Sequence, residues 1–136
     1  MGYTYYRLSA LIPRDVTLTF PEVANALQGK FSRVQPAPQI TVDDKSCVLR
    51  WNDWSFRLHF ENQPHVIEDS REIAERFASN RADQERIAAC DRRITTAADP
   101  DPDMSHFNHY IYVMETLESI KGIYVFDPND GKFTNE

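Results

Sequence analysis

Glycine and cysteine are scarce in this chain of 136 residues. The four glycines, at positions 2, 29, 122 and 131, are too far apart to form a glycine-rich loop that cradles a phosphate. No stretch approaches the roughly 18 apolar residues that a membrane helix needs, and nothing at the N-terminus resembles an export signal. These absences predict a cytoplasmic protein that does not bind a membrane.

The two cysteines, Cys47 and Cys90, belong neither to a C-x-x-C pair nor to a metal-ligand spacing. Neither has a base at a diagnostic spacing, and the G-x-S-x-G turn of many hydrolases is missing. We interpret both cysteines as small buried hydrophobic residues, although their number also allows a bridge between them. The sequence therefore predicts no catalytic residue and no cofactor.

Positive charge is outweighed by negative charge. The 21 aspartates and glutamates exceed the 15 lysines and arginines, which leaves a net charge of -6. Such an excess repels phosphate backbones, so nucleic acid is disfavoured as a partner. The electrostatic complement of this chain is a basic protein.

The composition itself is that of a globular protein, with 41% hydrophobic and 26% charged residues. A chain of this length can bury roughly two-thirds of the surface that it exposes when unfolded. No repeat and no change in composition marks a boundary. We therefore expect residues 1–136 to form a single domain.

Hydrophobic periodicity predicts an α+β fold, with a mostly antiparallel sheet and helices packed on one face of it. The predicted order of elements is β-α-β-β-β-α-α-β-α-β. Gly29 is expected to end the first helix, and Asp69 or Ser70 to cap the second. The expected strands are residues 3–12, 39–43, 47–51, 54–61, 92–97 and 123–126, and the expected helices are residues 20–28, 70–78, 82–89 and 107–120.

The strand at residues 54–61 has the clearest alternation in the chain. Its predicted core face carries Trp54, Phe56, Leu58 and Phe60. The opposite face carries Arg57, His59 and Glu61, with Arg50 on the neighbouring strand, and is a candidate protein-binding surface. Charged strand faces more often keep a sheet soluble. At least one of Trp51 and Trp54 is expected in the core, and an exposed one would anchor a partner.

An acidic loop precedes the last predicted helix. Asp99, Asp101 and Asp103 alternate with prolines, and His106 and His109 follow. Carboxylates and imidazoles can converge on a cation, but the glycine and the glutamate of a calcium-binding loop and the H-E-x-x-H pattern of zinc hydrolases are missing. A solvated loop that interacts favourably with the dipole of the last helix is the favoured interpretation, and its three aspartates join the candidate protein-binding residues.

Two segments carry a resemblance, namely FNHYIYVMETL at residues 107–117 and IYVFDPNDGKF at residues 123–133. Together they span about 22 residues, and the combination resembles small bacterial domains of the kind found among toxin-immunity proteins. The resemblance implies a non-catalytic inhibitor that covers the active site of a toxin, and an acidic surface would suit a cationic nuclease. It assigns no role to an individual residue.

Three hypotheses follow from the sequence. The first is a non-catalytic protein-binding module, in the form of an immunity-type inhibitor, which uses the acidic loop and the strand face at Arg57 and His59. The second is a small metal-dependent enzyme or metal-binding protein built on the segment from Asp99 to His109. The third is a structural subunit that pairs with itself as a homodimer.

Overall fold

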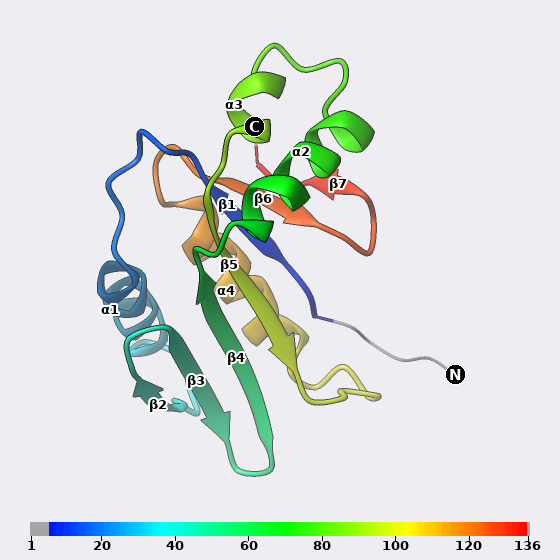
Figure 1. The fold of residues 1–136 in the computed structure, drawn as a ribbon. Helices are drawn as coiled ribbons and strands as arrows, with labels where there is room; N and C mark the ends of the chain where they lie inside the picture. The colour runs from blue at the N-terminus through cyan, green and yellow to red at the C-terminus, as the bar shows by residue number, and fades with distance from the viewer. Residues whose placement is uncertain (1–5, 136) are drawn as a thin grey trace.

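The computed structural model describes residues 6–135, and within this range the chain forms four helices and one seven-stranded sheet (Figure 1). The strands are β1 (Ser9–Ile12), β2 (Gln39–Val42), β3 (Ser46–Trp51), β4 (Trp54–Glu61), β5 (Arg92–Ala98), β6 (Tyr124–Asp127) and β7 (Lys132–Phe133). The helices are α1 (Phe20–Phe31), α2 (His65–Phe77), α3 (Gln84–Ala88) and α4 (Phe107–Glu118). The predicted α+β class is confirmed.

The sheet has the strand order β2-β3-β4-β5-β1-β6-β7, and all neighbours pair antiparallel. The predicted meander is present as β2, β3 and β4, with Cys47 opposite Leu58 and Trp51 opposite Trp54. The predicted order of elements holds, with one addition. The short strand β7 pairs Phe133 with Phe126 and extends the sheet beyond β6.

One face of the sheet packs against α1 and α4. The first core cluster takes its side chains from these two helices and from five strands, including Ala10 of β1, Leu49 of β3 and Leu58 of β4. Of the four predicted inward residues of β4, Trp54, Phe56 and Leu58 belong to it, and Phe60 packs against it while partly buried. The burial of this continuous apolar layer is the main contribution to folding on this side.

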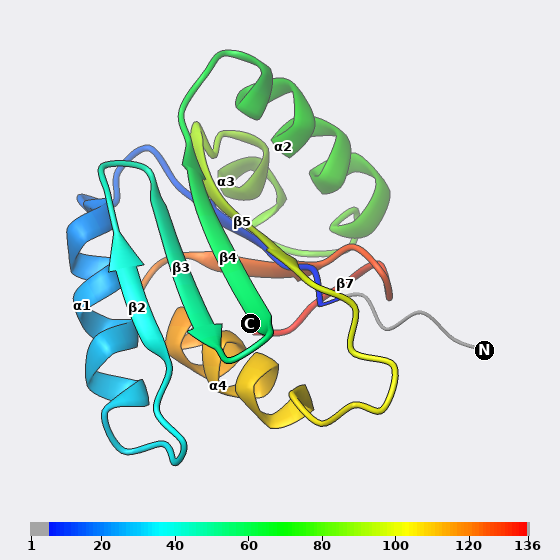
Figure 2. The ribbon, with the colours of Figure 1, turned by 90° about the horizontal axis from the view of Figure 1, so that it is seen from below.

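The opposite face packs against α2 and α3, which corrects the expectation that all helices lie on one face. A second, smaller cluster joins Leu11 of β1 to Ala74 of α2 and Ile87 of α3. Figure 2 shows the sheet between the two helical layers. Strand β1 lies near the middle of the sheet, so it sends Ala10 to one cluster and Leu11 to the other. Period-two alternation reveals two faces but not which helix covers each.

The helix α1 continues past Gly29, where the sequence predicted its end. Phe31 in the added turn is fully buried and its ring lies 5.6 Å from that of Trp51 in an edge-to-face arrangement. The burial of one aromatic side chain outweighs the cost of about 1 kcal/mol for a glycine inside a helix. At the other end, Thr19 and Glu22 form the predicted capping box.

The helix α2 begins at His65, earlier than the predicted cap at Asp69 or Ser70. Val66 in the first turn is fully buried, which fixes this turn on the sheet. The Asp69 carboxylate does not cap the helix, because it accepts a hydrogen bond of 2.8 Å from Nη1 of Arg93 on β5. Arg93 also donates through Nε to Glu61 on β4 at 2.6 Å. One guanidinium thus ties α2 to two strands.

The first strand is shorter than predicted. The described part of the chain has β1 only at Ser9–Ile12, and residues 3–5 of the predicted strand lie outside the described residues. Before β1, the hydroxyl of Thr96 accepts from the Leu8 amide at 2.8 Å and donates to the Tyr6 carbonyl at 3.1 Å. A side chain therefore satisfies the backbone where the regular ladder stops.

None of the helices formed by residues 6–135 is long and apolar enough to cross a membrane. The longest of them, α2, has 13 residues.

Replacing Arg93 by alanine is expected to lower the free energy of unfolding by about 2 kcal/mol, because it leaves the mostly buried Glu61 carboxylate without its cation. Chemical denaturation measures the loss. The matched control is Arg76→Ala, since Arg76 pairs with Glu72 on the exposed side of α2, where both side chains are more than half exposed. That change should cost less than about 0.5 kcal/mol, and equal losses would contradict a tethering role for Arg93.

Candidate functional site

Half of one sheet face is left without a helical cover. Helices α2 and α3 pack over β1, β6 and the adjoining part of β5, and the second core cluster has no member on β2, β3 or β4. The face of the meander that looks away from α1 and α4 is therefore open, as the lower part of Figure 1 shows. We call it the open sheet face. Its exposed side chains are Gln39, Thr41, Arg50 and His59.

The two sequence-predicted patches meet at one edge of this face. Strand β5 ends opposite Phe56 and places Asp99 beside β4. The Asp99 carboxylate accepts from Nη1 of Arg57 at 3.1 Å and from the amide and hydroxyl of Ser55 at 3.0 Å each. Burial raises the pKa of Asp99, but this set of donors outweighs that effect and holds the pKa below its usual range. Arg57 and Asp99 therefore form one fixed ion pair, and the strand face continues into the acidic loop.

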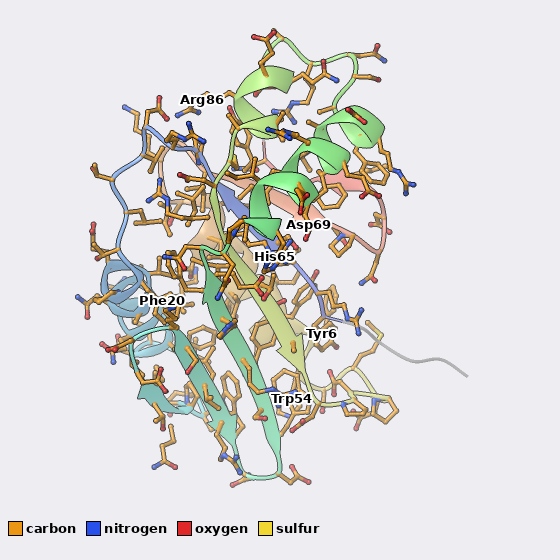
Figure 3. All side chains as sticks on the ribbon, in the orientation of Figure 1. Tyr6, Phe20, Trp54, His65, Asp69 and Arg86 are labelled. Carbon is orange, nitrogen blue, oxygen red and sulfur yellow. The ribbon has the colours of Figure 1, made fainter. Side chains whose placement is uncertain are left out.

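Glu61 occupies the opposite end of β4 and is committed to the fold. Its carboxylate bonds Arg93 and lies 3.8 Å from Nε2 of His65. His65 and Asp69 lie along α2, above β4 and β5 (Figure 3). Glu61 thus anchors the helix that borders the open sheet face, whereas His59 stands exposed between the two ion-paired ends.

Asp101 differs most from its predicted role. Only 2% of its surface is exposed, so it does not face a partner from a solvated loop. Its carboxylate accepts from the Tyr6 hydroxyl at 2.5 Å, from the His106 amide at 2.9 Å and from the Ser105 hydroxyl at 3.3 Å. Burial and this bond raise the pKa of Tyr6 well above its usual range. Asp101 is the internal acceptor that shapes the loop, and it brings the N-terminal segment to the start of α4.

Asp103 is exposed and accepts from the Ser105 amide at 3.2 Å, a bond that lowers its pKa. Together with Asp53 from the turn between β3 and β4 it borders an open pocket of about 460 Å³. Trp54, Asp101 and His106 also line this pocket. Its rim is acidic, which suits the cationic side chain of a partner.

Asp101 and Asp103 both accept from Ser105, through its hydroxyl and its amide, whereas Asp99 bonds Ser55 and Arg57 on β4. Within residues 6–135 no group of three or more histidine, cysteine, aspartate or glutamate side chains is placed to hold a metal ion. The second sequence hypothesis therefore gains no structural support from this segment.

Both tryptophans are buried, at 5% exposure for Trp51 and 4% for Trp54. Their indole N–H groups donate to the carbonyls of Pro36 and Asp99, at 2.9 Å each. The expectation that at least one lies in the core is met by both, and neither serves as an exposed anchor. Trp54 thus fixes the tip of the meander to the acidic loop, and Trp51 fixes it to the segment before β2.

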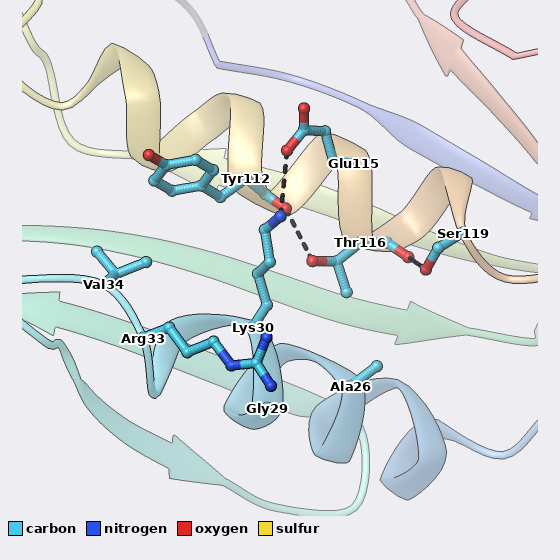
Figure 4. Close-up of a pocket in the computed structure, with 9 residues that line it drawn as sticks. All are labelled: Ala26, Gly29, Lys30, Arg33, Val34, Tyr112, Glu115, Thr116 and Ser119. Carbon is cyan, nitrogen blue, oxygen red and sulfur yellow. Dashed lines mark hydrogen bonds and ion pairs between the residues drawn. The ribbon is translucent and has the colours of Figure 1, made fainter.

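A further pocket lies elsewhere, in a groove of about 630 Å³ between α1 and α4 (Figure 4). Lys30 and Glu115 face each other across it at 3.3 Å. The hydroxyls of Thr116 and Ser119 donate to carbonyls of α4 itself, at 2.8 and 2.6 Å. Sequence reasoning missed this groove because its residues come from two distant helices. The Lys30 ammonium and the hydroxyls of Thr116 and Ser119 are therefore occupied.

The buried thiols are poor nucleophiles. Cys47 belongs to the first core cluster and Cys90 to the second, so the sheet separates them and both are free. Burial raises the pKa of Cys47 to about 11 and that of Cys90 to about 12. The thiolate form is therefore rare at neutral pH. The interpretation of both cysteines as buried hydrophobic residues is confirmed.

Comparisons of this chain with protein-family models, with curated proteins and with solved structures gave no match.

Asp101→Ala is expected to lower the free energy of unfolding by about 2–3 kcal/mol, because it leaves the buried Tyr6 hydroxyl and the His106 amide without an acceptor. Asp103→Ala serves as the control in the same loop, since Asp103 is exposed and should have a much smaller effect. Chemical denaturation measures both. A loss as small for Asp101 as for Asp103 would contradict the organising role of Asp101.

Proposed function

We propose that this chain is a non-catalytic protein-binding module whose partner docks on the open sheet face. The observation that carries the proposal is the uneven cover of the sheet, which leaves β2, β3 and β4 bare on one side while their other side packs into the core. A bare sheet face is flat and rigid, so binding to it costs little conformational entropy.

The charges of this face support binding rather than solubility alone. Arg57 and Asp99 already hold each other at 3.1 Å, and Arg93 holds Glu61 at 2.6 Å. Charges fixed in this way present a defined pattern and need no ordering when a partner arrives. Between them, Arg50 and His59 are exposed and have no ion pair within residues 6–135. These two residues are available to a partner.

The partner that we propose is a basic protein, in the form of a toxin that this chain inhibits. The net charge of -6 favours encounter with a cationic surface. The acidic rim of Asp53 and Asp103 lies where the acidic loop meets the turn between β3 and β4, and it suits a lysine or arginine side chain. The resemblance of residues 107–117 and 123–133 to immunity proteins points to the same class.

A capture experiment tests this proposal. Tagged protein is used to capture partners from cells in which the chain is native, in three forms: wild type, the double variant Arg50→Ala with His59→Ala, and the control Gln28→Ala with Arg71→Ala. All four positions are exposed, and the control pair lies on α1 and α2. Circular dichroism establishes that each form is folded.

We expect wild type and control to retain the same basic protein. The sheet-face variant should bind this protein with at least tenfold lower affinity, which corresponds to about 1.4 kcal/mol. The purified partner should bind with the same preference, and its activity should fall when wild type is added. Equal retention by all three forms would contradict the open sheet face as the binding site. A partner whose activity is unchanged would contradict inhibition but not binding.

A specific observation also favours the third hypothesis, self-association. Strand β2 is an edge of the sheet, and its residues Gln39–Val42 are all uncharged. Asp43 donates its amide to the Ser46 carbonyl at 2.9 Å, so by the alternation of an antiparallel ladder the backbone groups of Ile40 and Val42 point to the free edge. Val42 is 37% exposed. An uncharged edge can pair with the same edge of a second copy.

If β2 pairs with itself, the molar mass measured by light scattering should rise toward that of a dimer as the protein concentration increases. Val42→Lys should abolish the rise, because a charge on an edge strand opposes pairing. Lys132 already lies on the other edge strand, β7, so Thr134→Lys beside that strand provides the control. A monomer at every concentration would exclude a homodimer.

A further inference from the structure

Two histidines and two tryptophans form a compact cluster where the tip of the meander meets the start of α4. His109 stacks on Trp51, with ring centroids 4.1 Å apart and planes within 8°. His106 stacks on Trp54, with centroids 4.2 Å apart and planes within 3°. The Nδ1 atoms of the two histidines lie 3.0 Å from each other. Each imidazole is thus held by an indole while it faces the other imidazole.

The contact between the two Nδ1 atoms limits how many protons the pair can hold. A neutral imidazole has one N–H and one nitrogen with a free lone pair, whereas an imidazolium has two N–H groups. The contact is a hydrogen bond only when one Nδ1 carries a proton and the other does not. The pair can therefore be neutral or carry one positive charge. When both rings are charged, two N–H groups and two positive charges oppose each other.

The charged groups described around the pair are carboxylates of the acidic loop and of the turn between β3 and β4, whereas helix α1 adds no charge. Asp101 lies beneath the pair, and Asp53 and Asp103 line the same pocket as His106. Helix α1 contributes the uncharged ring of Phe31, 6.5 Å from that of His109. His106 is the N-cap residue of α4. Burial and the neighbouring His106 lower the pKa of His109, and Asp101 only partly offsets them.

We propose that the pair of His106 and His109 is a pH-sensitive switch. The pair holds the acidic loop against the meander while one proton lies between the two Nδ1 atoms. When a second proton binds, so that both rings are charged, the pair releases the loop. His106 is the ring that leaves, because it belongs to the loop and borders the open pocket. His109 stays on α4. The release breaks the stack on Trp54 and frees the loop on the N-terminal side of the helix. This inference does not depend on the proposed function.

The direction of the effect on stability follows from the lowered pKa of His109. The folded state disfavours a proton on this ring, whereas the unfolded chain takes one up at the ordinary value of 6.5. The stabilisation is therefore present above pH 6.5 and is lost as the pH falls from there through the lowered pKa. The switch operates on the acidic side of neutrality.

A pH titration followed by nuclear magnetic resonance tests the switch. The imidazole nitrogens and the indole N–H groups of the folded protein are observed from mildly alkaline to acidic pH. Because the two rings share a proton, the pair should titrate in two separated steps, and the signal of Trp54 should shift with the second step. A single step in which both rings are protonated together, with no shift of Trp54, would overturn the proposal.

The variant His106→Phe keeps an aromatic ring against Trp54 but removes the shared proton. In this variant His109 should take up its proton at higher pH than in wild type, because the repulsion by His106 is gone, and the step of Trp54 should be lost. His59→Phe is the matched control, since His59 is exposed and far from the cluster in the sheet, and it should leave both signals unchanged. An unchanged titration of His109 in His106→Phe would overturn the proposal, and the wild-type titration decides it if this variant fails to fold.

Discussion

Strand β5 pairs with β4 on one side and with β1 on the other, and the continuous sheet depends on these two pairings. Strand β5 joins the meander to the half of the sheet that carries β1, β6 and β7. It also supplies Arg93, which ties α2 to the sheet, and Thr96, which satisfies the backbone before β1. At its end it delivers Asp99 to Arg57. Within the sheet, the meander reaches β1 and β6 only through this strand.

The position of β5 also explains why the sheet is unevenly covered. Helices α2 and α3 come between β4 and β5 in the chain and fold back over the strands on the far side of β5. They leave the meander bare on that side, whereas α1 and α4 cover it on the other. The bare face is polar because alternation places Arg57 and His59 there. A flat polar face with fixed ion pairs is the feature on which a binding function rests.

The acidic loop has two parts with different roles. Asp101 is buried and serves the fold, as the acceptor for Tyr6 and His106. Asp103 is exposed and, with Asp53, gives the nearby pocket its acidic rim. The histidine pair follows both aspartates, at the start of α4, and contacts both tryptophans of the meander. A change in its protonation would therefore act on the contact between the loop and Trp54.

Apart from the two-residue strand β7, the sequence alone determined the elements and their order, because strands and helices follow from local periodicity. The meander from Gln39 to Glu61 is an example, since alternation and short polar turns specify antiparallel neighbours. The sequence also indicated which residues of β4 face the core and that Arg57 and His59 do not. Those inferences need only residues that are close together in the chain.

Only the tertiary structure decided which face each helix covers, where α1 and α2 end and begin, and which loop residues are buried. Asp69 resembles a helix cap in sequence, but Arg93, 24 residues away, takes its carboxylate. Asp101 looks solvated, but Tyr6, 95 residues away, bonds to it. The stacking of His106 and His109 on Trp54 and Trp51 likewise joins segments that are distant in the chain. Contacts of this kind depend on the packing of the whole sheet, which no local pattern encodes.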